Sequence, residues 1–176
     1  MTGAGRPAGG WPLAALAVAL GVAARARAVT APDDAVKAAF VAKFGAFVQW
    51  PRAAARPAPT ICVVGDDPVA ADLERLKPSP AAPVEVRRLA AVDARSRCDL
   101  LYAAGGGRQP VSEALAAVAG RPVLTVTDAR RSGARGMIHF VVRQDRVRFI
   151  IDAQQAERSG LQISAKLLAL AESVKR

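Results

Sequence analysis

The sequence predicts an α/β fold: a layered αβα domain with a mainly parallel sheet and an antiparallel hairpin at its C-terminal edge. Two observations lead to this prediction. Short apolar runs typical of strands alternate with helix-like segments through residues 33–127. Two further strand-like runs, joined by a two-residue turn, occupy residues 137–152. Such alternation is typical of parallel sheets covered by helices, whereas a tight turn joins antiparallel strands.

Residues 1–28 have the order of a secretory signal peptide. Arg6 supplies a positive charge, residues 11–24 form an uninterrupted apolar run, and residues 26–28 place small side chains where signal peptidase cleaves. The run is shorter than the roughly 20 residues that span a bilayer, which favours a cleaved leader over a membrane anchor. We therefore expect export to the periplasm and a single domain over residues 29–176.

The chain is strongly basic. Its formal net charge is +10, and loss of Arg6, Arg25 and Arg27 with the leader lowers it to +7. The remaining basic residues are scattered, with small clusters at Arg87-Arg88 and Arg130-Arg131. A basic surface favours anionic lipid or an acidic partner. Scattered arginine with few interleaved aromatic residues, in an exported protein, argues against nucleic-acid binding.

The first element after the leader is expected to be a helix. Asp33 and Asp34 suit its positive end, and Pro51 is expected to stop it just after Trp50. Apolar residues at three- and four-residue spacing mark the stripe that this helix buries. They are Val36, Phe40, Phe44, Phe47 and Val48.

The middle of the chain alternates between strands and helices. Strands are expected at residues 60–65, 84–89, 98–104 and 122–127, and helices at residues 68–76 and 110–119. Three prolines within residues 77–83 indicate a loop, and Gly105-Gly106-Gly107 ends the third of these strands.

The last third changes character. Residues 137–143 and 146–152 are expected to pair as a hairpin around Gln144-Asp145. Alternation in the second strand gives it one apolar face. A final helix is expected to end at Lys175-Arg176, whose charges complement its dipole. Its apolar residues are Leu161, Ile163, Leu167, Leu168 and Leu170.

Two cysteines, Cys62 and Cys98, would both enter an oxidising compartment. Paired cysteines are the rule in exported domains, and closing this loop would stabilise the fold by roughly 3–4 kcal/mol. The alternative is two separate buried thiols, because each cysteine lies in an apolar, strand-like run. His139 is the single histidine, without the Cys/His spacing that zinc needs, so we expect no metal site.

The residues of a catalytic mechanism do not assemble in this sequence. No GxSxG motif is present, and His139 lies inside an expected strand, where a lone histidine is more often structural. Residues 105–107 lack the GxGxxG spacing of a nucleotide-binding loop and are better interpreted as a flexible turn. We therefore expect neither a catalytic residue nor a cofactor.

A ligand site at the strand ends is the remaining chemical possibility. Asp66, Asp67 and Asp128 each come just after a strand or at its end, at the edge where α/β folds bind ligands. Ordinary turn chemistry is the better explanation of these acids. The candidate ligand residues at this edge are Asp66, Gly105, Gly106 and Asp128.

An ordered series of short segments runs along most of the chain: VKAAF (36–40), KF (43–44), FVQWP (47–51), ICVVGDDP (61–68), CDLLY (98–102), VLTVTD (123–128), GMI (136–138), RFIID (148–152) and GLQISAKLL (160–168). No single segment is specific. As a series they resemble the YfiR-like family of secreted bacterial proteins, and the resemblance covers nearly all of the chain beyond the leader.

This resemblance implies a function that composition does not show. The best-understood member is a periplasmic repressor that binds the periplasmic sensor region of an inner-membrane diguanylate cyclase and holds it inactive. An outer-membrane lipoprotein of the peptidoglycan-binding type captures that repressor, which raises cyclic di-GMP and promotes biofilm. The family's cysteine pair maps onto Cys62 and Cys98. A second pair, found in some members, is missing here because residues 131–139 contain no cysteine.

Two functional hypotheses follow. The first is a regulatory binding protein, monomer or homodimer, for which Trp50 and Pro51 are the candidate partner residues because aromatic residues dominate interface hot spots. The neighbouring phenylalanines are better explained as core. The second is a periplasmic small-ligand sensor, or the solute-binding subunit of a transporter or sensor kinase, that uses the strand ends.

Overall fold

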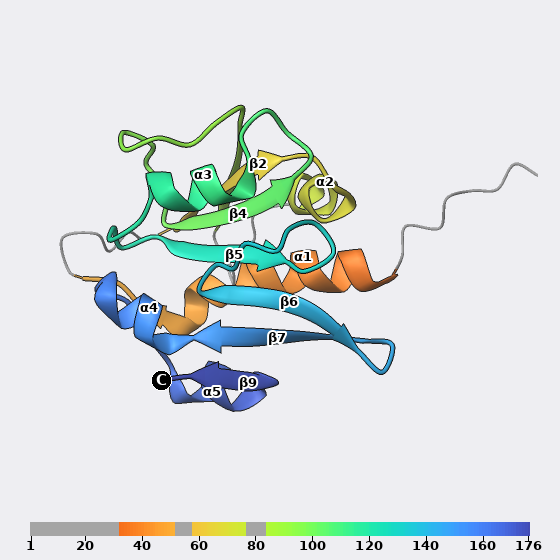
Figure 1. Cartoon of the computed structure of the whole chain (residues 1–176), viewed down its shortest axis with the longest axis vertical. Helices are drawn as coiled ribbons and strands as arrows, with labels where there is room; N and C mark the ends of the chain where they lie inside the picture. The colour runs from red at the N-terminus through yellow and green to blue at the C-terminus, as the bar shows by residue number, and fades with distance from the viewer. Residues whose placement is uncertain (1–31, 52–57, 77–83) are drawn as a thin grey trace, which may run out of the picture.

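The computed structural model describes residues 32–51, 58–76 and 84–176 (Figure 1). The predicted leader and the proline-rich segment 77–83 lie outside these ranges. Within them, a seven-stranded sheet in the order β3-β2-β4-β5-β6-β7-β9 forms the centre of the molecule. The layered α/β fold that the sequence predicts is therefore confirmed. No helix among the described residues has the length and apolar character to cross a membrane.

The central sheet is parallel from β3 to β6. Strand β7 then pairs antiparallel with β6, and β9 pairs parallel with β7. The strands are β2 (Thr60–Gly65), β3 (Glu85–Leu89), β4 (Leu100–Gly105), β5 (Leu124–Asp128), β6 (Ile138–Arg143), β7 (Arg146–Asp152) and β9 (Ser173–Lys175). A separate two-stranded sheet joins β1 (Val48–Gln49) to β8 (Gln162–Ile163) in antiparallel fashion.

Helices cover the two faces of the sheet unequally. Helices α1 (Pro32–Phe44) and α2 (Pro68–Arg75) bury their apolar residues on one face, together with α5 (Ala165–Leu170) and α4 (Ala153–Arg158). Helix α3 (Val111–Ala117) covers a second, smaller core on the other face, over β2 and β4. Four phenylalanines hold the larger core, with neighbouring ring centroids 5.4–6.4 Å apart. They are Phe40, Phe44, Phe140 and Phe149.

The first helix is shorter than the sequence predicts. It begins at Pro32, so Asp33 and Asp34 lie in its first turn rather than at the cap. It ends at Phe44, after which residues Gly45–Phe47 form a 3-10 turn, η1, and β1 follows. Strand β1 pairs with β8, more than a hundred residues later in the chain, and this pairing overrides the helical spacing of the apolar residues. Val36, expected in the buried stripe, is 43% exposed.

The hairpin prediction is confirmed, with one difference at the edge. Gln144 and Asp145 both adopt positive φ, 49° and 55°, as the tight turn between β6 and β7 requires. However, β7 is not the edge strand, because β9 pairs along it with Ile150 opposite Ser173. The edge strand of a sheet leaves its backbone groups unpaired, and β9 satisfies those of β7.

The final helix predicted from Leu161 to Lys175-Arg176 is wrong in extent. Residues Gln162–Ile163 form β8, and α5 starts only at Ala165, where the Ser164 hydroxyl accepts a hydrogen bond from Leu167 N at 3.3 Å. Lys175 lies in β9 rather than at a helix end. Helix α4 is an additional element, capped by Asp152, whose carboxylate accepts from Gln155 N at 2.8 Å.

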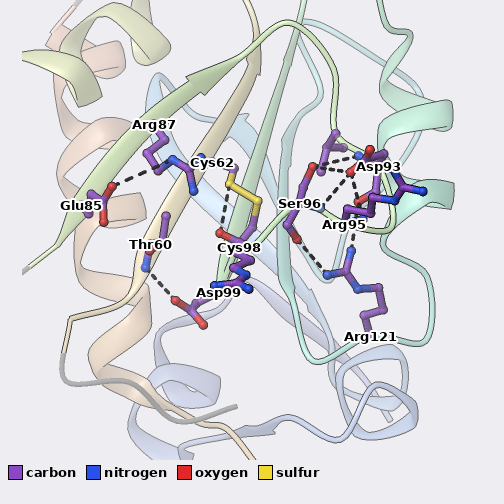
Figure 2. Close-up of a disulfide and its surroundings, with 12 residues drawn as sticks. Thr60, Cys62, Glu85, Arg87, Asp93, Arg95, Ser96, Cys98, Asp99 and Arg121 are labelled. Atoms are coloured by element: carbon purple, nitrogen blue, oxygen red, sulfur yellow. Dashed lines mark hydrogen bonds and ion pairs between the residues drawn. A yellow bond between two sulfur atoms is a disulfide. The ribbon is translucent and has the colours of Figure 1, made fainter.

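The disulfide prediction is confirmed. Cys62 on β2 and Cys98, just before β4, are bonded, with their α-carbons 5.6 Å apart (Figure 2). That separation lies within the range that a disulfide spans. Beside the bridge, Thr60 N donates to the Asp99 carboxylate at 2.8 Å and Arg121 donates to Ser96 O at 2.8 Å. The bridge thus joins neighbouring strands in the core beneath α3.

Removing this bridge should destabilise the fold without changing it. The double variant Cys62→Ala/Cys98→Ala should lose about 3–4 kcal/mol in free energy of unfolding, because the unfolded chain regains the freedom of a 36-residue loop. Urea denaturation with and without dithiothreitol measures the effect. The double variant should be insensitive to reductant, and equal stability of oxidised and reduced wild-type protein would contradict a stabilising bridge.

Candidate functional site

The carboxyl ends of the parallel strands gather the residues proposed as a ligand site. Strand β2 lies between β3 and β4, and the chain runs from β2 to β3 in one direction along the sheet and from β4 to β5 in the opposite direction. Such a switch point is where α/β folds place ligands. The structure brings Asp66, after β2, beside Gly105 and Gly106 at the end of β4. Asp128 ends β5, one strand farther along.

Backbone packing fills the switch point. Asp66 N donates to Gly105 O at 2.7 Å. A Cβ at Gly65 would lie 2.2 Å from Gly105 O, and one at Gly106 would lie 2.8 Å from Asp66 O. All three glycines also have φ between 71° and 95°, which other residues rarely adopt. These glycines serve the close approach of two loops, and a ligand site here stays a prediction without support from the geometry.

Asp128 is engaged with a lysine that the sequence analysis did not single out. The Lys37 side chain on α1 is fully buried, and its Nζ donates to Asp128 Oδ2 at 2.5 Å. The other oxygen, Oδ1, accepts from Arg130 N at 2.9 Å. Asp34 Oδ1 lies 3.9 Å from the same Nζ. A buried charge needs such partners, so Asp128 joins α1 to the sheet and is not free to bind a ligand.

Asp67 is engaged in a second buried network. Its Oδ1 accepts from Ala70 N at 2.7 Å, which caps α2, and its Oδ2 accepts from the Tyr102 hydroxyl at 2.8 Å. Arg131 Nε lies 3.7 Å away. Burial raises the pKa of the Asp67 carboxyl, opposed by these hydrogen bonds and by Arg131. Burial and the neighbouring carboxylate also raise the pKa of Tyr102, so its phenol stays a donor.

Trp50 and Pro51 form a corner of the molecule with the β1–β8 sheet, named here the Trp50 corner. The Trp50 side chain is half-buried against the larger core, and its Nε1 lacks a hydrogen-bond partner among the described residues. Pro51 is exposed and lies beside Gly160, where a Cβ would come within 3.3 Å of Pro51 Cγ. Trp50 is therefore both a core residue and a partly exposed aromatic surface.

A further exposed apolar residue lies on α5, the helix that follows β8. Leu170, on α5, is 60% exposed. It comes after β8, whose partner strand β1 ends immediately before Trp50. The sequence places Leu170 among the apolar residues of the predicted final helix. In the structure Leu170 is the last residue of the short helix α5 and lies on the surface.

The chain matches one described family. The sequence profile of the YfiR/HmsC-like family matches residues 34–172. The matched segment contains Lys37, Trp50, Asp128 and both cysteines. No curated protein matches the chain.

Breaking the buried Lys37–Asp128 pair should lower the free energy of unfolding far more than breaking an exposed ion pair would. Lys37→Met leaves a buried carboxylate without its cation and should lower the free energy of unfolding by about 3–5 kcal/mol. Lys37→Met combined with Asp128→Asn should lose less than the single variant, because no uncompensated charge remains. Urea denaturation followed by circular dichroism measures both.

Lys43→Met is the matched control, since Lys43 is an exposed lysine on the same helix. It should change the free energy of unfolding by less than about 0.5 kcal/mol. A loss for Lys37→Met as small as for Lys43→Met would contradict the role assigned to the buried pair.

Proposed function

The chain belongs to the YfiR/HmsC-like family, and from this we propose that it is a periplasmic repressor of an inner-membrane diguanylate cyclase. The family is regulatory rather than catalytic and is known for periplasmic regulators of diguanylate cyclases. In our proposal the protein binds the periplasmic sensor region of the cyclase and stabilises its inactive state. Synthesis of cyclic di-GMP, and with it biofilm formation, then falls.

The family match over residues 34–172 carries this proposal. The chemistry of the strand ends supports it. The Asp67 and Asp128 carboxylates are held by internal hydrogen bonds, and Asp66 Oδ1 lies 3.4 Å from Nη1 of Arg88. The switch point is closed by glycine backbone. Because these carboxylates already have partners within the protein, they support a protein that acts by binding a partner rather than by catalysis.

Export supports the same proposal. Residues 1–28 have the sequence of a leader, and the Cys62–Cys98 bridge suits an oxidising compartment. We further propose that an outer-membrane, peptidoglycan-binding lipoprotein relieves repression by capturing the protein. A homodimer is compatible with both roles.

Repression by contact sets a requirement on the interface. Moving a two-state cyclase from mostly active to mostly inactive takes about 5.5 kcal/mol of differential affinity. A standard interface buries roughly 800 Å² per partner, and a few aromatic or apolar anchors supply most of its energy. Trp50, Pro51 and Leu170 are the anchors that we propose, because they combine apolar side chains with exposed surface.

Deletion of the gene should raise cyclic di-GMP in cells that express the cognate cyclase, because the inactive state of the enzyme loses its stabilising ligand. Mass spectrometry of cell extracts measures the nucleotide, and a plasmid-borne wild-type copy should restore the low level. Unchanged cyclic di-GMP with a functional cyclase present would contradict repression and favour the ligand-sensor alternative.

The proposed anchor residues give a sharper test. Leu170→Gln should weaken repression without lowering the melting temperature, because the side chain is mostly in solvent. Val36→Gln, at an exposed apolar position on α1, should change neither property. Trp50→Ala should weaken repression and also cost about 1–3 kcal/mol of stability, because the indole is half-buried. Equal repression by Leu170→Gln and Val36→Gln would remove Leu170 from the interface.

A further inference from the structure

A hollow opens on the sheet face opposite α1. In Figure 1, α1 passes behind β5 and β6, whereas no helix of the described residues lies in front of the middle of β6 and β7. Side chains that alternate with the buried core residues point to this uncovered face: His139 lies between Ile138 and Phe140, and Ile150 lies between Phe149 and Ile151. The hollow has a volume of about 480 Å³ and is lined by residues from β6, β7 and β9. Cavities of this size accommodate small organic ligands.

A buried histidine lines this hollow. His139 is 4% exposed, and its Nδ1 lies 2.7 Å from Thr127 Oγ1. Gly136 N donates to the same Oγ1 at 2.9 Å. Within the described part of the chain, Nδ1 is the one acceptor bonded to this hydroxyl, so we assign the hydroxyl proton to Nδ1 and the imidazole proton to Nε2. Among the described residues Nε2 has no hydrogen-bond partner, and the side chain lines the hollow.

The charge of the hollow is positive. Lys175 Nζ is 3.1 Å from Asp152 Oδ2, so these two lining charges compensate each other. Arg135 also lines the hollow, is exposed, and has no ion-pair partner within the described part of the chain. Burial and then the positive charge of Arg135 lower the pKa of His139, against a smaller opposing effect of Asp128. The imidazole is consequently a neutral donor beside an unpaired guanidinium.

We propose that this hollow binds a small organic anion, whose carboxylate or phosphate group is held by the Arg135 guanidinium and the His139 Nε2–H. A planar guanidinium presents paired donors that fit the oxygens of either group. The Ile150 side chain supplies an apolar contact for the body of the ligand. This site is independent of the Trp50 corner, because Trp50 packs against the core on the other face of the sheet.

The single histidine makes this site directly observable. Phenyl phosphate, benzoate and neutral benzyl alcohol are titrated into the purified protein without a histidine tag, and the imidazole signals of His139 are followed by NMR. At least one anion should give a saturable shift, and benzyl alcohol should give none. The anion that binds more tightly shows whether the natural ligand is a phosphate ester or a carboxylate. No saturable shift with either anion overturns the proposal.

Two arginine variants separate a specific site from general charge. Arg135→Gln should weaken anion binding at least tenfold, measured by isothermal titration calorimetry, at an unchanged melting temperature. Arg143→Gln, at an exposed arginine on β6 that does not line the hollow, should bind as the wild type does. Equal weakening by both variants would mean that the anion only follows the net charge, and would overturn the site. Repression in cells is not used as a readout, so this result is independent of the proposed function.

Discussion

The buried ion pair between Lys37 and Asp128 fixes α1 on the sheet. Taking both charges out of water is costly, so neither partner tolerates loss of the other. The pair joins the first half of α1 to the end of β5, and the rings of Phe40 and Phe44 hold the rest of the helix against β6 and β7. Because α1 leads directly through η1 into β1, this anchoring also determines where Trp50 is presented.

Internal hydrogen bonds and close backbone packing also occupy the carboxyl ends of the strands. In many α/β proteins the loops at a switch point diverge and leave space for a ligand. Here the loops after β2 and β4 meet through glycine backbone, while Asp67 and Asp128 hold α2 and α1 in place. The residues that would bind a ligand in a related architecture stabilise this one. Surfaces elsewhere, at the Trp50 corner and over β6, β7 and β9, remain for recognition.

The sequence predicts this fold where local patterns are decisive. Buried strands such as β2 and β4 are continuous apolar runs, and the β6–β7 turn has a local backbone requirement, so each is recognisable alone. The early end of α1 depends on pairing with β8, and Lys37 has its partner 91 residues away. Neither leaves a periodic signal. The hollow is equally non-local, because Lys175 joins Arg135 and His139 only when β9 pairs with β7.

Regulation by contact at the Trp50 corner is the central claim, and hydrogen–deuterium exchange tests it most directly. The protein is compared alone and with the isolated periplasmic sensor region of its cognate cyclase. Contact should slow amide exchange in residues 45–51 and 160–170, with little change at residues 65–67 and 105–107. Protection confined to the strand-end loops, or no protection at a saturating concentration of the sensor region, would contradict the account.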